Sequence, residues 1–402
     1  MARLRRRPEV RAVVRIARGH GIPAWLVGGA VRDAVLGLPV PEVDVAVDRD
    51  AEELARELER DGLGTAVFLS RDRPGPRVFR VAGRRPLDVA EIEGGSIDAD
   101  LARRDFTVNA IAVDLEDGRI LDPFGGLADL SRRRLRCVRA RNLAEDPLRA
   151  LRAARFLATH GLSPDAETLA AARGVAAELP RVARERIAVE LAKLLEAPEA
   201  GPAFAWAARA GLLPAVLGLP LSALESARAA RALTPLDGRW IRGLSPERRR
   251  RLRVARLASR LPLALSAEGA GRWLRALRLP RRDVEPILRL VELARAAAAV
   301  RSRRGAVAWR LAAGALAPDA LLLLGLDGAA KARRARRLGL ASRAPLGRVA
   351  VTGDDVIRWL SHAPGPRVGI LLERLRLEAA LGTVRNRREA RHWLTGQSRE
   401  RP

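Results

Sequence analysis

The sequence contains one cysteine, Cys137, and two lysines, Lys193 and Lys331, among 402 residues. A single thiol excludes an internal disulfide and a cysteine-rich zinc site. No apolar run approaches the roughly 18 residues that a membrane span needs, and the basic N-terminal segment lacks the apolar core of a secretory signal. We therefore predict a cytoplasmic protein that does not bind membranes, long enough for two or more domains.

The positive charge is unevenly distributed along the chain. The formal net charge is +27, yet residues 1–140 contain 25 basic and 23 acidic residues. Residues 141–402 contain 49 basic and 24 acidic residues, a net charge of +25. A compositional preference for arginine explains part of this excess, but it would not leave residues 1–140 nearly neutral. A long basic segment joined to a near-neutral one is typical of a protein that binds a polyanion.

The hydrophobic pattern changes near residue 140. Before it, short alternating runs predict strands, and helices are expected at 29–37 and 50–60. The strand-like runs are EVDVAV, TAVFLS, RVFRVA, PLDVAEI and VNAIAVDL. From about residue 141 onward the pattern is helical and is interrupted by glycine and proline. The chain is therefore expected to have an α+β fold, with a small mixed sheet and helices followed by an all-helical remainder.

Acidic residues recur at alternate positions of the first of these runs. Glu42 and Asp44 are two residues apart, so a strand would place them on one face. Asp88, in PLDVAEI, would add a third carboxylate from a neighbouring strand. Carboxylates at a sheet edge suit Mg²⁺, which activates an attacking hydroxyl and stabilises a leaving pyrophosphate. Acidic alternation alone, however, is more typical of a solvated strand end.

A glycine pair precedes the first predicted helix. Gly28 and Gly29 allow a close approach of the backbone, and the helix start offers N–H groups and a positive dipole end to a phosphate. Arg32, one turn further on, adds a fork-shaped cation. A lone glycine pair usually marks a turn. Together with the two carboxylates in the same short span, it predicts a nucleotide-phosphate site beside a metal site.

Arginines recur every three residues after Asp146 and Pro147, at positions 149, 152 and 155. One interpretation is a helix with Asp146 as N-cap, an Asp146–Arg149 pair and a solvated basic face. The other is a protein template for bases. Cytosine and adenine each present an amino donor beside a ring-nitrogen acceptor, which a carboxylate and a guanidinium can match. Guanine and uracil would leave buried polar groups unpaired there.

Six sequence blocks, in this order, resemble the tRNA nucleotidyltransferase (class II) and bacterial poly(A) polymerase family, within the polymerase-β-like nucleotidyltransferases. The resemblance implies a nucleotidyltransferase head (1–140), a helical neck with the base-selecting motif (141–200), a helical body (201–345) and an RNA-binding helical tail (346–402). The blocks are GGAVRDAVLGLPVPEVD, DLARRDFTVNAIAVD, ILDPFGGLADLSRRRLRCV, AEDPLRALRAARFLATHGL, RERIAVELAKLL and the segment from VTGDDVIRWL to NRREA.

The resemblance also implies roles for individual residues. Glu42 and Asp44 would ligate Mg²⁺ and, with Asp88, form the catalytic carboxylates. The nucleotide-binding residues would be Gly28, Gly29 and Arg32 at the triphosphate, Arg104 and Asp105 at phosphate and ribose, Asn109 as their brace, and Asp146, Arg149, Arg152 and Arg155 at the base. Arg184, Glu185, Arg186 and Glu190 would brace the neck rather than touch substrate.

The implied activity is template-independent addition of CMP, as CC or as the full CCA, to tRNA 3′ ends from CTP and ATP. A poly(A) polymerase, an A-adding enzyme and a weakened RNA-binding relative stay open as alternatives, and no protein partner is expected. Two features depart from the family pattern. Glu42 stands where the family normally has aspartate, and only residues 89–102 separate Asp88 from Arg103. Members that add only CC share that short separation.

Overall fold

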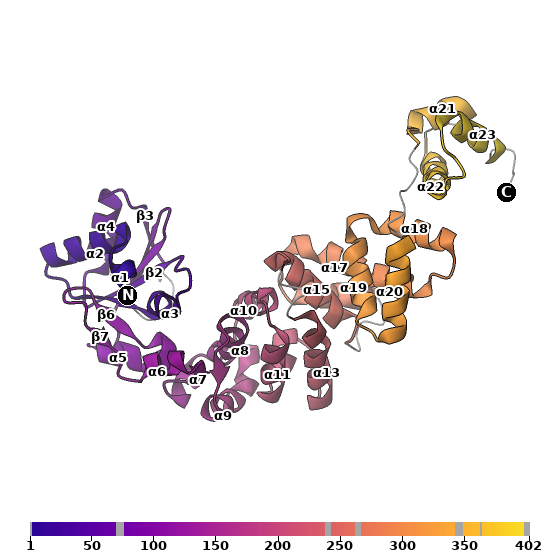
Figure 1. Ribbon diagram of the computed structural model, residues 1–402. Helices are drawn as coiled ribbons and strands as arrows, with labels where there is room; N and C mark the ends of the chain where they lie inside the picture. Colours follow the sequence, from indigo (N-terminus) through magenta and orange to yellow (C-terminus); the bar gives the residue numbers. More distant parts are fainter. Residues whose placement is uncertain are drawn as a thin grey trace. The chain divides into compact units, whose positions relative to one another are not determined.

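The computed structural model describes residues 2–69, 76–237, 243–261, 267–341, 349–361 and 364–397. The chain divides into two compact units. The N-terminal unit comprises residues 1–246 and 276–278, and the C-terminal unit comprises residues 247–275 and 279–402. Figure 1 shows strands in the first part of the chain and helices throughout the rest, as the sequence pattern predicts.

A seven-stranded mixed sheet forms the centre of the N-terminal unit, in the order β3-β4-β5-β2-β1-β6-β7. Only β2 and β5 pair in parallel; every other pair in this sheet is antiparallel. The strands are β1 (Ala24–Val27), β2 (Val43–Val47), β3 (Thr65–Phe68), β4 (Val78–Ala82), β5 (Leu87–Glu91), β6 (Ala112–Asp114) and β7 (Ile120–Leu121).

Amphipathic helices cover part of this sheet. In α2 (Pro8–Gly19) the buried side chains Val10, Val13 and Ile16 recur at helical spacing. This helix packs against α4 (Ala51–Arg60), which in turn packs on β4 and β5. The remaining helices of residues 1–140 are α1 (Ala2–Arg5), α3 (Gly28–Val35), α5 (Ile97–Ala102) and α6 (Gly126–Ser131).

The strand prediction is wrong for the first part of VNAIAVDL. Thr107–Asn109 forms a 3₁₀ helix, η1, and the strand begins at Ala112. The Asp105 side chain accepts hydrogen bonds from the Phe106 backbone and from the Asn109 amide. Such side-chain bonds give the backbone an alternative to strand pairing. The first predicted strand also starts one residue late, so Glu42 directly precedes β2.

Helices complete the N-terminal unit, with α8 (Leu148–His160) at their centre. It packs against α10 (Arg184–Glu196) and α11 (Gly201–Arg209), and Phe156 makes an edge-on contact with Phe106 of residues 1–140. The short strands β8 (Arg134–Leu135) and β9 (Ser163–Pro164) pair in parallel. The other elements are α7 (Ala140–Glu145), α9 (Ala166–Gly174), η2 (Ala176–Arg181), α12 (Leu213–Leu217), α13 (Ala223–Leu233) and η3 (Thr234–Leu236). The division at residues 140, 200 and 345 stays a prediction.

Arginines inside the C-terminal unit are paired with buried aspartates. In α15 (Pro246–Ala258), Arg250 and Arg251 both bind Asp283, whose side chain is fully buried. Part of the arginine excess is therefore structural. The other helices are α16 (Ala267–Ala276), α17 (Arg281–Ala299), α18 (Arg303–Ala313), η5 (Gly314–Leu316), α19 (Ala317–Gly325), α20 (Ala329–Ala341), α21 (Gly353–Leu360), α22 (Pro366–Leu381) and α23 (Arg387–Gln397).

One segment of the described residues, Arg303–Gly325, is long and apolar enough by length and composition to cross a membrane. Charged residues interrupt its sequence, so it contains no unbroken apolar run of that length. The structure divides it into α18, η5 and α19, and 44% of its apolar window is buried. Core helices of soluble proteins have the same length and composition, and α19 packs against α17 and α20.

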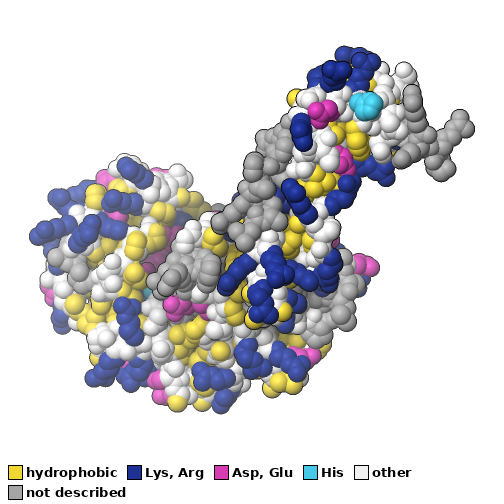
Figure 2. Space-filling model, turned by 45° about the vertical axis from the view of Figure 1, so that its right-hand side comes forward, with side chains coloured by type: hydrophobic (Ala, Val, Ile, Leu, Met, Phe, Trp, Pro, Cys, Tyr) yellow, Lys and Arg dark blue, Asp and Glu magenta, His cyan; other side chains and the backbone are white. Residues whose placement is uncertain are grey.

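In the view of Figure 2, lysine and arginine side chains are more widespread than aspartate and glutamate side chains. On α20, Arg333, Arg336 and Arg337 are exposed. The charge asymmetry predicts that such residues, rather than those of the near-neutral first 140 residues, bind RNA.

We expect the triple variant R333Q/R336Q/R337Q to bind tRNA more weakly than the natural protein. Each lost phosphate contact should lower the slope of log K against log[salt] by about 0.7–0.9. The matched control is R6Q/R11Q/R119Q, which removes three exposed arginines from the first 140 residues. Fluorescence anisotropy with labelled tRNA between low and moderate salt measures both slopes. If the affinity for tRNA and the steepness of its salt dependence decreased equally in the two variants, the prediction would be contradicted.

Candidate active site

Three neighbouring strands bring two carboxylates and a guanidinium side by side. Asp44 of β2 lies opposite Asp88 of β5 in the parallel pair, and Asp88 lies opposite Arg80 of β4 in the antiparallel pair. Glu42 precedes β2 at its edge, two residues before Asp44. The sheet register therefore gathers the three predicted acidic residues at one end of β2.

Asp44 lies in a strongly negative environment. Its pKa is raised by burial and by the charges of Asp88 and Glu42, against which Arg104 and Arg32 act. A buried carboxylate with further carboxylates around it favours the binding of a cation. Among the described residues, no three acidic, histidine or cysteine side chains converge as a complete metal site. An ion held by Asp44 and Glu42 would thus complete its shell with water and phosphate oxygens, as Mg²⁺ prefers.

The glycine pair allows Asp44 and an arginine to approach the start of α3. Gly28 has a φ of +65°, and a Cβ there would lie 2.9 Å from Nη1 of Arg104 and 3.4 Å from Oδ2 of Asp44. Any larger residue at position 28 would be strained and would displace the arginine. Gly29 lies close to the same carboxylate. The backbone of α3 therefore starts next to both a carboxylate and a cation.

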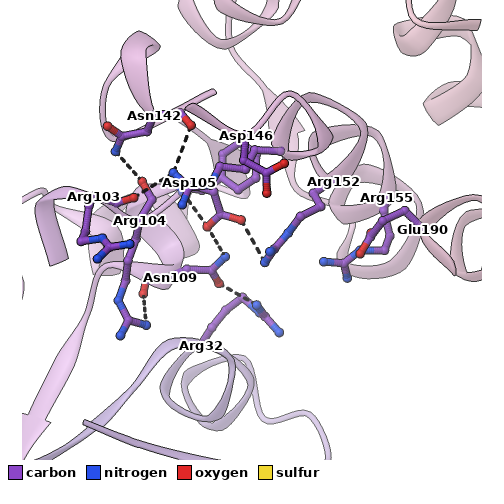
Figure 3. Close-up of polar contacts among 12 residues, drawn as sticks. Arg32, Arg103, Arg104, Asp105, Asn109, Asn142, Asp146, Arg152, Arg155 and Glu190 are labelled. Atoms are coloured by element: carbon purple, nitrogen blue, oxygen red, sulfur yellow. Dashed lines mark hydrogen bonds and ion pairs between the residues drawn. The ribbon is translucent and has the colours of Figure 1, made fainter. Parts of the chain in front are cut away.

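Arg32 differs from the open phosphate-binding cation that the sequence suggests. Its side chain is buried, and its Nε donates to Oδ1 of Asp33 at 2.8 Å and its Nη1 to Oδ1 of Asn109 at 2.6 Å. The guanidinium also stacks on the ring of Phe156, 4.9 Å from its centre. Arg32 thus joins α3 to η1 through Asn109 (Figure 3) and to α8 through Phe156.

Asp33 is a partner of Arg32 that the sequence analysis did not single out. Nε2 of His160, at the end of α8, lies 3.3 Å from Oδ1 of Asp33. Burial opposes ionisation of Asp33, but His160 and Arg32 hold its pKa below the usual value. Burial lowers the pKa of His160. The signal was present in the sequence, because Arg32 and Asp33 are adjacent in the same motif.

Asp105 is the centre of a buried polar network (Figure 3). Its carboxylate is 5% exposed, accepts from Nδ2 of Asn109 at 2.8 Å, and forms an ion pair with Nη2 of Arg152 at 2.9 Å. Burial alone would raise its pKa, but Arg152, Asn109 and the Phe106 backbone hold the pKa below the usual value. This ionised carboxylate links residues 1–140 to α8.

The arginine stripe of α8 is not a solvated basic face. Arg149 donates from Nη1 to the carbonyls of Arg103 and Asn142, Arg152 binds Asp105, and Arg155 binds Glu190 at 2.5 Å. Each of the three thus anchors a different neighbouring segment.

The interpretation of Asp146 as a helix cap is confirmed, but its side-chain pair with Arg149 is not. The assigned helix begins at Leu148 after Pro147, and Oδ1 of Asp146 accepts from the Leu148 backbone at 3.3 Å, as an N-cap side chain does. Its Oδ2 atom binds Arg186 at 2.7 Å instead of Arg149. Arg186 of the predicted bracing motif thus holds the carboxylate that is expected to contact the base.

Arg80 is a site residue that the sequence analysis missed. Its Nε and Nη2 atoms bind the two carboxylate oxygens of Asp88 at 2.7 and 2.8 Å, and Nη2 lies 3.6 Å from Oε2 of Glu42. This pairing raises the pKa of the Arg80 guanidinium. The signal that would have revealed it is the hairpin between RVFRVA and PLDVAEI, since Arg80 and Asp88 are equidistant from its turn.

A cavity of about 300 Å³ lies beside these side chains. Asp44 and Asp88 line it together with Arg103, Arg104 and Arg149. A lining of carboxylates and guanidinium groups suits a ligand that carries phosphates together with a metal ion. Such a lining on a mixed sheet followed by helices is what a nucleotidyltransferase site requires.

The matching family models support this class. Residues 24–136 match the poly A polymerase head domain, and residues 161–221 match the probable RNA and SrmB- binding site of polymerase A. The CC-adding tRNA nucleotidyltransferase of Geobacter sulfurreducens is 34% identical over 95% of this chain and 94% of its own. The CCA-adding enzyme of Geobacillus stearothermophilus is 30% identical over 98% of both chains.

Solved structures agree over nearly the whole length. The Bacillus stearothermophilus CCA-adding enzyme in complex with CTP has a TM-score of 0.73 and 27% identity, covering 98% of both chains. The Thermotoga maritima CCA-adding enzyme complexed with tRNA shares the fold, with a TM-score of 0.75 at 21% identity over 99% of this chain and 98% of that chain. The chain belongs to the tRNA nucleotidyltransferase family of CC-adding and CCA-adding enzymes.

We expect the variant Arg152→Met to destabilise the N-terminal unit by about 2–3 kcal/mol at neutral pH, because it removes the cationic partner of the buried Asp105 carboxylate, although the Arg152 side chain is itself 36% exposed. Asp105 has a lowered pKa in the folded protein, so its ionised form contributes stability that is lost as the pH falls. The difference between natural and variant proteins should therefore narrow towards acid pH. Urea titrations at several pH values measure it.

The matched control is Arg181→Met, which removes an exposed arginine paired with Glu178. This variant should lower the free energy of unfolding by less than about 1 kcal/mol at every pH. Equal costs for the two variants would show that the Asp105–Arg152 pair contributes no more than a surface ion pair.

Proposed function

We propose that this protein adds CMP residues from CTP to the 3′ end of tRNA, releases pyrophosphate, and stops after the second C. The match to a CC-adding relative over 95% of the chain carries this proposal, and the cavity with its carboxylates and guanidinium groups supports it. Full CCA addition, with ATP as a further substrate, is the second candidate, because CCA-adding relatives also match the whole chain. A cytoplasmic location stays a prediction.

Asp44 and Glu42 would hold Mg²⁺ in this reaction. The raised pKa of Asp44 and the charges of Asp88 and Glu42 around it fit a divalent cation. When bound, Mg²⁺ lowers the pKa of an attacking hydroxyl and stabilises the negative charge of the leaving pyrophosphate. Glu42 is longer than the aspartate usual in the family, yet it keeps the oxygen ligand at this edge of the sheet.

The start of α3 would receive the triphosphate. Gly28 and Gly29 keep side chains away from the backbone N–H groups, which are suited to phosphate oxygens. Arg104 lies against Gly28 and lines the cavity, so its guanidinium can bind the same group. Arg32 would contribute indirectly. It binds Asn109 and so holds in place the segment that carries Arg104 and Asp105.

Asp146 and Arg149 would select the base. In the described part of the chain, the hydrogen bonds of the Arg149 side chain to Arg103 and Asn142 both use Nη1. Nη2 and Nε can therefore donate to a base. Asp146 uses one lone pair of each oxygen for Leu148 and Arg186, and a carboxylate can accept further hydrogen bonds. Arg186 and Leu148 thereby fix the orientation in which the carboxylate would meet the exocyclic amino group of cytosine.

The short connection between β5 and α5 supports a stop after CC. Only residues 92–96 separate Glu91 from Ile97. Glu93 forms an ion pair with Arg103, and Ser96 caps α5 by accepting from the Ala99 backbone at 3.2 Å. The resemblance links a longer loop at this place to complete CCA addition. This connection is short and is fixed at both ends, unlike that longer, flexible loop.

We expect purified protein with Mg²⁺ and labelled CTP to extend tRNA that lacks CCA by two nucleotides. With ATP it should leave tRNA ending in CC unchanged. Asp44→Ala should lower CMP addition by more than about 100-fold, because a direct metal ligand is lost, while tRNA binding stays within twofold. Gel electrophoresis resolves the products. Addition of A to CC-ended tRNA would establish the second candidate, and normal turnover by Asp44→Ala would contradict the metal site.

The base-selecting role of Asp146 predicts a change in selectivity. Asp146→Ala should raise the ratio of UTP to CTP incorporation by at least about tenfold, because the mismatch with the carboxylate disappears. Arg186→Ala, which frees the same carboxylate without removing it, is the control and should change the ratio less. Incorporation of all four nucleotides under single-turnover conditions measures it. A less stable Asp146→Ala protein with unchanged selectivity would show that Asp146 only caps the helix.

A further inference from the structure

Arg80 lies on the same face of the sheet as the catalytic carboxylates. Along β4, Phe79 and Val81 are buried on the opposite face, whereas Val78 lines the cavity beside Asp44 and Asp88. Because side chains alternate along a strand, Arg80 shares the face of Val78. Arg77 has the other parity and pairs with Glu52 of α4 and, at 3.9 Å, with Glu91. Arg80 thus pairs with Asp88 and Glu42, and Arg77 pairs with other acidic residues.

Arg80 binds one of the three carboxylates through two of its three guanidinium nitrogens. The two hydrogen bonds to Asp88 occupy both carboxylate oxygens, at 2.7 and 2.8 Å. Parallel bonds of this kind are the strongest form of arginine–carboxylate pairing. The more distant contact with Glu42, at 3.6 Å, draws this longer side chain towards the same guanidinium. No hydrogen bond joins Asp44 to Arg80 in the described part of the chain, and Arg104 and Arg32 are the main positive charges that act on Asp44.

We propose that Arg80 is a positioning residue that keeps Asp88 out of the metal-binding set and holds Glu42 beside Asp44. The inference rests on the proposed function, in which Asp44 and Glu42 hold the ion. Two carboxylates and a nearby guanidinium bind a divalent cation weakly, so the phosphate oxygens of the nucleotide supply the remaining attraction. Metal and nucleotide then bind together. Without Arg80, three free carboxylates would bind the ion before the nucleotide arrives.

The alternative is that Arg80 only fastens the β4–β5 hairpin. Both roles predict a less stable protein when Arg80 is removed, and both allow slower turnover. They differ in the affinity for metal in the absence of nucleotide. A hairpin fastener leaves this affinity unchanged or lowers it, whereas the positioning role predicts that it rises.

The experiment measures Mn²⁺ binding to the nucleotide-free, full-length protein by electron paramagnetic resonance of the free ion. Arg80→Ala should bind Mn²⁺ about tenfold more tightly, because it removes one positive charge from a solvated site and releases the Asp88 carboxylate. Arg80→Lys keeps the positive charge but not the paired hydrogen bonds, so its Mn²⁺ affinity should lie between those of the natural protein and Arg80→Ala. The matched control Arg77→Ala removes a positive charge from the other face and should stay within twofold.

Double variants separate this inference from the proposed function. In Arg80→Ala with Asp88→Asn, the increase in Mn²⁺ affinity over the natural protein should be less than threefold, because a neutral amide replaces the carboxylate that Arg80 would otherwise release. Asp44→Ala should abolish binding in every background. If it does not, the metal site of the proposed function is wrong. If Asp44→Ala abolishes binding but Arg80→Ala leaves it unchanged or weaker, only the role of Arg80 is overturned.

Discussion

The buried carboxylate of Asp105 is the interaction on which the N-terminal unit depends. It is ionised, it accepts from Asn109 and the Phe106 backbone, and it pairs with Arg152 of α8. Through Asn109 it also controls Arg32, and thus α3 with its glycine pair. One charge therefore sets the position of the helix expected to bind the triphosphate relative to the helix expected to read the base. Removing a single partner would leave a buried charge, which is far more costly than losing a surface pair.

A second constraint is the crowding of negative charge at the edge of the sheet. Asp44 and Asp88 are adjacent because β2 and β5 pair in register, and Glu42 adds a third charge two residues away. The chain reduces this repulsion with arginines placed on different elements. Arg80 on β4 binds Asp88, and Arg104 after α5 approaches Asp44 across Gly28. The remaining negative charge lies at Asp44, where the proposed metal ion would bind.

Local pattern predicted much of this arrangement. Alternation in EVDVAV and PLDVAEI placed Asp44 and Asp88 on strands, and the change of period near residue 140 placed the transition to helices. The pattern failed at the start of VNAIAVDL. There the Asp105 side chain binds the Phe106 backbone and the Asn109 amide, and η1 forms in place of the predicted strand. The orientation of Arg32 and the partner of Asp146 depend on side chains 77 and 40 positions away. No local pattern contains such contacts.

The arginine excess shows how burial changes the meaning of composition. Each buried charge needs a partner, so buried acidic residues hold arginines in the interior, as Asp283 holds Arg250. In the described part of residues 141–402, the buried charged side chains are five acidic residues (Glu190, Asp283, Asp319, Asp355 and Glu378) and three arginines (Arg250, Arg253 and Arg256). Three of these acidic residues pair with arginines that reach the surface: Asp319 with Arg248, Glu378 with Arg304 and Asp355 with Arg387. At these places the surface presents a guanidinium group whose carboxylate partner lies beneath it, so composition alone does not say how much of the arginine charge is available to a polyanion.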